Sequence, residues 1–175
     1  MTRILAIDPG PLRSGAVLLD TATRAVLRSA TPDNGDLAFE LNDPECALFD
    51  RVVVEMPESR GKSWVKEESW ETAYWTGRLI EAASRWYPVG RIHRSAVKAH
   101  ILGRANGSDA DVNGALVDRY GGIGGRRAAV GVKAAPGPLY GVTGDAWAAL
   151  AVAVAIADGV ETLEERRERE AREAA

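Results

Sequence analysis

The sequence predicts an α/β fold in which helices flank a mixed five-stranded sheet. Three apolar segments, at 3–8, 15–20 and 24–29, are joined by short links, which favours an antiparallel meander at the start of the chain. A fourth strand at 51–55 is continuous in valine, as expected for a strand in the middle of a sheet. The chain beyond it is mainly helical in pattern, so helices are expected to cover this sheet.

The remaining elements follow from periodicity and capping residues. The predicted elements, in order, are a loop and short helix at 31–49, a helix at 66–87, a fifth strand at 91–93, a helix at 96–102 capped by Ser95, a helix from Asp109 or Asp111 to Tyr120, and a buried helix at 144–157. The first three strands and the two later ones together make the mixed five-stranded sheet, and the helices cover it.

We expect one domain at 1–158 followed by a charged helical tail at 159–175. Within the domain, 121–141 is rich in Gly, Pro and Ala and carries basic residues, which predicts a mobile basic loop. The tail has favourable i,i+4 pairs from Glu165 to Arg169 and from Glu168 to Arg172, with almost no apolar stripe.

Composition limits the class of protein. The chain has 175 residues, of which 46% are hydrophobic, and no apolar run is long enough to cross a membrane. No secretory leader is visible, and the one cysteine, Cys46, is expected to be a small buried side chain in a reducing compartment. We therefore expect a cytoplasmic protein; the sequence leaves open whether it is encoded by a cell or a virus.

Charge is unevenly distributed along the chain. The formal net charge is −3, which argues weakly against a nucleic-acid partner. Residues 60–133, however, contain thirteen Lys or Arg and seven Asp or Glu. This bias predicts a local basic face, with a mixed solvated surface as the alternative.

Two predicted strands each end in a carboxylate with a proline close behind. Asp8 is followed by Pro9, and Glu55 is followed by Met56 and Pro57. Ligands in such sheets bind at the carboxyl ends of strands, so the two acids are expected to share one site. An Asp-Pro turn and a structural salt bridge are the alternatives, and the occurrence of both acids together favours the site.

A third acid, Asp145, opens the predicted buried helix at 144–157. The alternative is an ordinary acid in a first helical turn, favoured by the helix dipole. Carboxylate oxygens suit Mg²⁺ or Mn²⁺, and two such ions about 3.5–4 Å apart activate a water and stabilise a leaving oxygen. The predicted cofactor is therefore Mg²⁺ or Mn²⁺, with two ions per active site.

Five short motifs contain or surround these acids. They are Asp8-Pro9-Gly10 with Ser14-Gly15, Val53-Val54-Glu55, Trp75-Thr76-Gly77-Arg78, Ser95-Ala96-Val97-Lys98, and Gly144-Asp145-Ala146 with the helix that follows. In their order and spacing they resemble the RuvC family of Holliday-junction resolvases, which belongs to the ribonuclease H-like superfamily. The resemblance covers most of residues 1–157.

The resemblance implies a ribonuclease H-like domain that forms a homodimer and nicks two symmetry-related strands of four-way branched DNA. It implies that Asp8, Glu55 and Asp145 hold the divalent metal and that Lys98 neutralises a phosphate. A solvated helix lysine is the alternative for Lys98. Water activated by the metal would attack the phosphodiester and leave a 5′-phosphate and a 3′-hydroxyl.

Contacts with DNA are expected outside the acidic site. The expected DNA-binding residues are Arg60, Lys62, Trp64 and Lys66, just after Glu55, and Arg126 and Arg127 in the basic loop. Trp64 would stack on an unpaired base at the junction centre, or else fold onto the domain. The aromatic helix at 66–87 is the preferred dimer surface, with the charged tail as the second choice.

The chain departs from the family pattern at its last helix, which usually carries two metal-binding groups one turn apart. Asp145 is the only carboxylate there, with either Ala148 in place of the second group or Val142 in place of the first. The acids considered as substitutes are Glu58, Asp109 and Asp111.

Three other functions compete with the resolvase. They are a junction-binding protein of the same fold that does not cut, a related nuclease for branched DNA or RNA hybrids, and a phosphotransferase of the actin-like class. The last class needs two domains and a second phosphate loop, for which this chain is too short.

Overall fold

The structure, a computed structural model, describes residues 2–45, 48–58 and 67–175. The strands are β1 (Arg3–Asp8), β2 (Gly15–Asp20), β3 (Val26–Ala30), β4 (Arg51–Met56), β5 (Val89–His93), β6 (Gly131–Val132) and β7 (Ala135–Pro136). The α-helices are α1 (Asn34–Leu41), α2 (Glu67–Ser84), α3 (Arg94–Leu102), α4 (Asp109–Gly121), α5 (Gly125–Ala129), α6 (Ala146–Ala157) and α7 (Leu163–Glu173). Cys46 lies outside the described residues.

The main sheet has five strands in the order β3-β2-β1-β4-β5. The first three strands pair antiparallel, whereas β4 runs parallel to both β1 and β5. The predicted mixed five-stranded sheet is therefore confirmed. The central position of β4 explains its run of buried valines, because both of its faces are covered.

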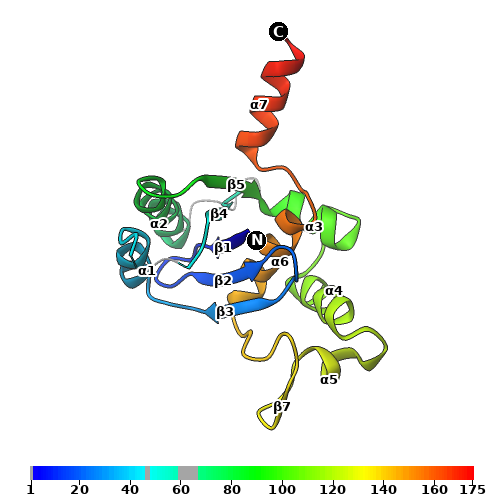
Figure 1. Ribbon diagram of the computed structural model, residues 1–175. Coiled ribbons are helices and arrows are strands. Elements are labelled where there is room, and N and C mark those ends of the chain that lie inside the picture. Colours follow the sequence, from blue (N-terminus) through cyan, green and yellow to red (C-terminus); the bar gives the residue numbers. More distant parts are fainter. Residues whose placement is uncertain (1, 46–47, 59–66) are drawn as a thin grey trace.

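Helices cover the two faces of this sheet in separate groups, as Figure 1 shows. Side chains of a strand alternate between faces, so Leu5 and Ile7 face one way and Ile4 and Ala6 the other. The face of Leu5 and Ile7 packs against α1 and α2, and the opposite face packs against α3, α4 and α6. Each face has its own hydrophobic core.

Helix α6 is the central element of the second core. Ten of its twelve residues are buried, and it contacts β1, β2 and β4. Small side chains let it lie close to the sheet: a Cβ placed on Gly15 would come within 2.2 Å of the carbonyl oxygen of Asp145. Although α6 is strongly apolar, it is short. No helix in the described parts of the chain has the length and apolarity needed to cross a bilayer.

The start of α3 differs from the prediction. The helix begins at Arg94, with His93 as its N-cap residue, so Ser95 is not the cap. Glu58 takes over the capping function, because its two carboxylate oxygens accept hydrogen bonds from the Ser95 backbone N–H at 2.8 Å and from its hydroxyl at 2.6 Å. A carboxylate is favourable at a helix N-terminus, where the backbone N–H groups and the dipole attract negative charge.

The segment 121–141, predicted as a loop, contains regular structure. It holds a 3₁₀ turn η2 (Gly122–Gly124), helix α5 and the β6–β7 hairpin. Ala129 and Leu139 are fully buried, and the backbone N–H of Leu139 donates to the carbonyl of Ala129. The prediction of a loop was wrong because the segment forms its own hydrogen bonds and contributes these two side chains to the core.

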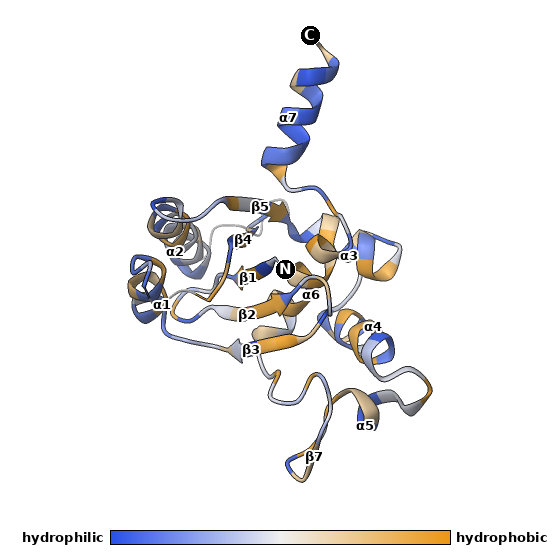
Figure 2. Cartoon of the chain, in the orientation of Figure 1, coloured by the Kyte–Doolittle hydropathy of each residue, from blue (hydrophilic) through white to orange (hydrophobic). Residues whose placement is uncertain are grey.

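The predicted tail is helical and extends away from the sheet, as Figure 1 shows, with a hydrophilic surface along most of α7, as Figure 2 shows. Its first turn is attached to the domain: Glu165 pairs with Arg51 at 2.8 Å, and Glu164 pairs with Arg91. Partial burial acts in the opposite direction, but hydrogen bonds from Arg51 and Thr162 lower the pKa of Glu165 to about 2. The domain boundary after residue 158 stays a prediction.

We predict that Gly15→Ala destabilises the protein by about 2 kcal/mol or more, because the new methyl group would meet the backbone of Asp145 and push α6 from the sheet. Urea denaturation measures the change in free energy of unfolding. The matched control is Gly114→Ala on the exposed side of α4, where a Cβ meets no atom within 4 Å. That control should gain about 0.5–1 kcal/mol. Equal stability of Gly15→Ala and wild type would contradict the close approach.

Candidate active site

Asp8 and Glu55 lie side by side at the ends of adjacent parallel strands. Ala6 pairs with Val53, so continuing the register by two residues places Asp8 beside Glu55. Both carboxylates point to the face of the sheet that packs against α6, because side chains two residues apart share a face. The sequence prediction that these two acids share one site is confirmed in its geometry.

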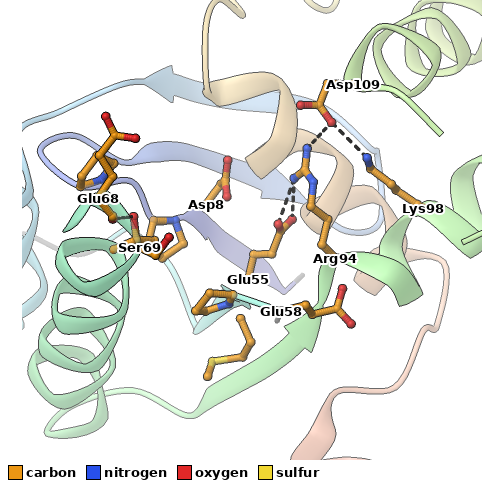
Figure 3. A pocket seen from close by; sticks show the side chains of 13 residues that line it. Asp8, Glu55, Glu58, Glu68, Ser69, Arg94, Lys98 and Asp109 are labelled. Atoms are coloured by element: carbon orange, nitrogen blue, oxygen red, sulfur yellow. Dashed lines mark hydrogen bonds and ion pairs between the residues drawn. The ribbon is translucent and has the colours of Figure 1, made fainter. Parts of the chain in front are cut away.

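The two acids line a pocket of about 460 Å³, shown in Figure 3. Its walls come from the ends of β1 and β4, the first turns of α2 and α3, and Asp109 at the start of α4. Glu58 and Glu68 also line it. A smaller pocket of about 100 Å³ continues from Asp8 toward α6. Together they form an acidic cavity at the carboxyl ends of two parallel strands.

Arg94 is the central cation of this cavity. Its Nη1 donates to both carboxylate oxygens of Glu55, at 2.9 and 3.1 Å, and its Nη2 donates to Asp109 at 2.5 Å (Figure 3). Arg94 follows β5 directly and stands two residues after Ile92, which faces the same core as α6. The same alternation that aims Glu55 into the pocket therefore aims Arg94 at it.

Lys98 lies one helical turn further along α3. Its side chain is buried, and its Nζ donates to the carbonyl of Gly107 at 2.6 Å and lies 3.2 Å from Asp109. The alternative of a solvated lysine is therefore wrong for this residue. Asp109 itself is mostly exposed, so it sits at the mouth of the pocket between two cations.

Asp145 precedes α6 and lines the smaller pocket together with Asp8 and Asp109. Its side chain is exposed and makes no capping hydrogen bond to the helix. Ala148 lines the same pocket, whereas Val142 is buried away from it. The family's last helix carries two metal-binding groups, and here either Ala148 replaces the second or Val142 replaces the first. The structure favours the replacement at Ala148.

Among the three acids considered as substitutes, Asp109 lines both pockets. Glu58 lines the larger pocket but is engaged with Ser95. Asp111 belongs to the capping box of α4, where it accepts from the backbone N–H of Ser108, and it pairs with Arg104. Of these three acids, Asp109 is therefore the best candidate to substitute for the second carboxylate of the family's last helix.

Two of the six predicted DNA-binding residues lie in the described part of the chain, away from the pocket. Arg126 and Arg127 are exposed on α5, and in the described parts of the chain neither has a carboxylate within 4 Å. They do not line the acidic pocket. The other four predicted residues fall outside the described residues: Arg60, Lys62, Trp64 and Lys66.

Burial and mutual repulsion disturb the titration of the two central acids. Burial, with the negative charges of Glu55 and Asp145, raises the pKa of Asp8 to about 8 against the attraction of Arg94. Burial also raises the pKa of Glu55, with Arg94 opposing it. Glu55 thus has a bound counter-charge, whereas no hydrogen bond or ion pair reaches the carboxylate of Asp8 from the described residues.

The donor set fits a divalent cation in chemistry but is not assembled as a ligand cluster. The acidic groups of the pocket are carboxylates, which Mg²⁺ and Mn²⁺ prefer as ligands, and a cation would favour the ionised form of Asp8, whose pKa is raised. Over the described ranges, however, no three His, Cys, Asp or Glu side chains lie close enough together to hold a metal ion. Arg94 stands between Glu55 and Asp109, so metal binding requires side-chain movement.

Sequence reasoning did not single out Arg94, and it named Asp109 only as one of three alternatives. The signal for Arg94 was present in the register: a residue that follows a strand end, two positions after an inward-facing apolar residue, continues onto the same face. The prediction of Ser95 as a cap obscured it, because that placed Arg94 in a linker.

Solved structures of known proteins share this fold. The chain is similar to RuvC of Thermus thermophilus in complex with its Holliday junction substrate, at 17% identity and a TM-score of 0.61, over 88% of this chain and 92% of that one. It is also similar to a further structure of Thermus thermophilus RuvC, at 18% identity and a TM-score of 0.61, over 91% and 98%. No protein-family model and no curated protein sequence matches the chain.

The mixed five-stranded sheet, its flanking helices and these matches define a ribonuclease H-like fold. Within that class, the chain has the fold of RuvC, as the motifs in its sequence indicated. At this level of identity the likeness concerns the fold, and the activity is argued separately below.

We predict that Asp8→Asn stabilises the protein at pH 8 in the presence of a metal chelator. In the unfolded chain Asp8 titrates near 3.8 and in the folded protein near 8, so the folded state binds more protons between these values. Stability due to this group therefore falls as pH rises from about 4 to 8. The variant should be more stable than wild type at pH 8 by several kcal/mol, since each unit of difference between the two pKa values corresponds to about 1.4 kcal/mol.

Denaturant unfolding at pH 4, 6 and 8 measures this difference, which should shrink toward pH 4. The matched control is Asp118→Asn, which removes an exposed carboxylate on α4 that does not line the pocket. A gain for Asp8→Asn that is the same at all three pH values would show that charge is not its cause.

Proposed function

We propose that this protein is a structure-selective DNA endonuclease that resolves four-way junctions by metal-dependent hydrolysis of phosphodiesters. The observation that carries the proposal is the pair Asp8 and Glu55, set side by side at the ends of parallel strands in a RuvC-like fold. The match to a RuvC structure solved with a Holliday junction supports branched DNA as the substrate class.

In this proposal Asp8, Glu55 and Asp145 hold the divalent cations, Mg²⁺ or Mn²⁺ and two per active site. Asp109 is placed to assist them from α4. When bound, such cations lower the pKa of a water and stabilise the developing charge on the leaving oxygen. The raised pKa of Asp8 supports this role, because a nearby cation would relieve the repulsion that opposes its ionisation.

Lys98 orients and neutralises a phosphate in this proposal. Its buried side chain is held by Gly107, so its ammonium group is fixed at the pocket rather than sampling solvent. A cation that is held in place before the substrate arrives stabilises developing negative charge without reorganisation.

Affinity for DNA would come from basic residues outside the acidic pocket, with a strong salt dependence. Arg126 and Arg127 on α5 have the exposure that phosphate contacts need. Arg60, Lys62 and Lys66, and Trp64 as a stacking residue, remain part of this proposal on sequence grounds alone.

The experiment that tests the proposal is cleavage of a labelled synthetic four-way junction with Mg²⁺ or Mn²⁺. We predict that Asp8→Asn lowers the rate at least about 100-fold while Asp118→Asn, outside the pocket, leaves it unchanged. Linear duplex, flap and RNA–DNA hybrid substrates in the same assay separate a junction resolvase from a related nuclease.

Two results would contradict the resolvase. Wild type that binds the junction but cuts it no faster than Asp8→Asn would favour the non-cleaving junction-binding protein. Faster cleavage of RNA–DNA hybrids than of junctions would favour a different nuclease of the same fold.

We further propose that the protein acts as a homodimer through α1 and α2. A two-fold partner suits a substrate with two equivalent strands. Aromatic side chains gather on these helices: Phe39 and Trp75 line one groove, Tyr74 packs edge-on against Trp75, and Trp70 is 65% exposed. An exposed tryptophan such as Trp70 lies outside the core, which favours its use in an interface.

We predict that Phe39→Glu converts the dimer to a monomer and lowers paired nicking, because an exposed charge would be buried against the second copy. Light scattering after size exclusion measures the mass. Ile123→Glu, at another exposed apolar residue beyond α4, should leave the mass unchanged. A wild-type protein that is monomeric at high micromolar concentration would rule out this surface as a dimer interface.

A further inference from the structure

We propose that Arg94 is a built-in counter-cation of the acidic pocket and competes with the divalent cation for Glu55. This inference rests on the proposed metal-dependent function and concerns how metal binding is controlled. It assigns Arg94 as a positioning residue that must release Glu55 before Glu55 can act as a ligand.

The contacts of Arg94 define the competition. Nη1 lies 2.9 and 3.1 Å from the two carboxylate oxygens of Glu55, so one nitrogen engages both atoms that would face a metal ion. The Glu55 side chain is only 7% exposed, and both of its carboxylate oxygens already accept from this one guanidinium nitrogen. A divalent cation at Glu55 therefore requires the guanidinium to move.

Arg94 also has a second anchor that keeps it near the pocket after release. Its Nη2 contacts Asp109, which is 71% exposed at the pocket mouth. Rotation of the Arg94 side chain can therefore move its guanidinium from Glu55 to solvent or to a phosphate, while its contact with Asp109 persists. The planar guanidinium is well suited to phosphate oxygens, so the same residue can follow the substrate.

The position of Arg94 indicates that these ion pairs are what hold it there. It is the first residue of α3, where a cation opposes the helix dipole. Glu58 offsets this cost by capping the same helix end through Ser95. The N-terminus of α3 thus combines an anion that caps the helix with a cation directed away from it into the pocket.

Lys98 does not share this behaviour. Its Nζ is tied to the carbonyl of Gly107, it is buried, and it contacts Asp109 rather than Glu55. Of these two cations on α3, only Arg94 therefore stands between a central acid and an incoming metal ion.

Titration of the whole protein with Mn²⁺ in the absence of DNA, followed by calorimetry, tests this inference. We predict that Arg94→Gln binds Mn²⁺ about tenfold more tightly than wild type, because Glu55 no longer has to lose an ion pair. Arg94→Lys, which keeps the charge but not the two-armed geometry, should fall between the two.

The matched control is Arg28→Gln. Arg28 pairs with Glu40 through two nitrogens, so it breaks an arginine–glutamate pair of the same kind away from the pocket. Its Mn²⁺ affinity should equal that of wild type. Thermal unfolding of each variant shows whether it retains the fold, and Arg94→Lys keeps the test valid if Arg94→Gln unfolds.

The outcomes separate this inference from the proposed function. One outcome is that wild type binds Mn²⁺, Asp8→Asn does not, and neither Arg94 variant binds Mn²⁺ more tightly than wild type. That outcome would overturn the proposed competition between Arg94 and the metal ion and leave the metal-dependent function standing. If no folded variant binds Mn²⁺, both are overturned.

Discussion

Two carboxylates at neighbouring ends of parallel strands repel each other, and the surroundings of Asp8 and Glu55 are arranged around that repulsion. The parallel register of β1 and β4 fixes the two acids side by side, and burial removes the water that would screen them. Arg94 compensates Glu55, which leaves Asp8 with a pKa raised to about 8. The fold therefore stores unfavourable electrostatic energy at the point where a metal ion would be useful.

The elements that hold the acids in place are rigid. Both strands are central in the sheet, and α6 packs across them with almost every residue buried. The close contact of Gly15 with the backbone of Asp145 joins the start of α6 to β2, so the third acid is placed by the core rather than by a flexible loop. Because the backbones of the three acids stand on packed elements, only side chains would have to move for a cation to bind.

Much of this could be predicted from sequence, because strand ends and apolar periodicity are local signals. The sheet, Asp8 and Glu55 follow from them. Arg94 could not be recognised by composition, since its role depends on the register of β5 and on a capping carboxylate, Glu58, that lies far away in sequence. The segment 121–141 was misread for a related reason: its glycines suggested a loop, whereas tertiary burial of Ala129 and Leu139 orders it.

The two cations on α3 differ in what they can do, although both sit beside Asp109. Lys98 is buried and bound to a backbone carbonyl, and leaving that position would strand its charge away from water. Arg94 is partly exposed and bound to two carboxylates, so it can exchange one partner while keeping the other. A fixed charge suits the steady neutralisation of a phosphate. An exchangeable charge such as that of Arg94 suits a pocket whose acids need a counter-charge before a metal ion binds and must be free of it afterwards.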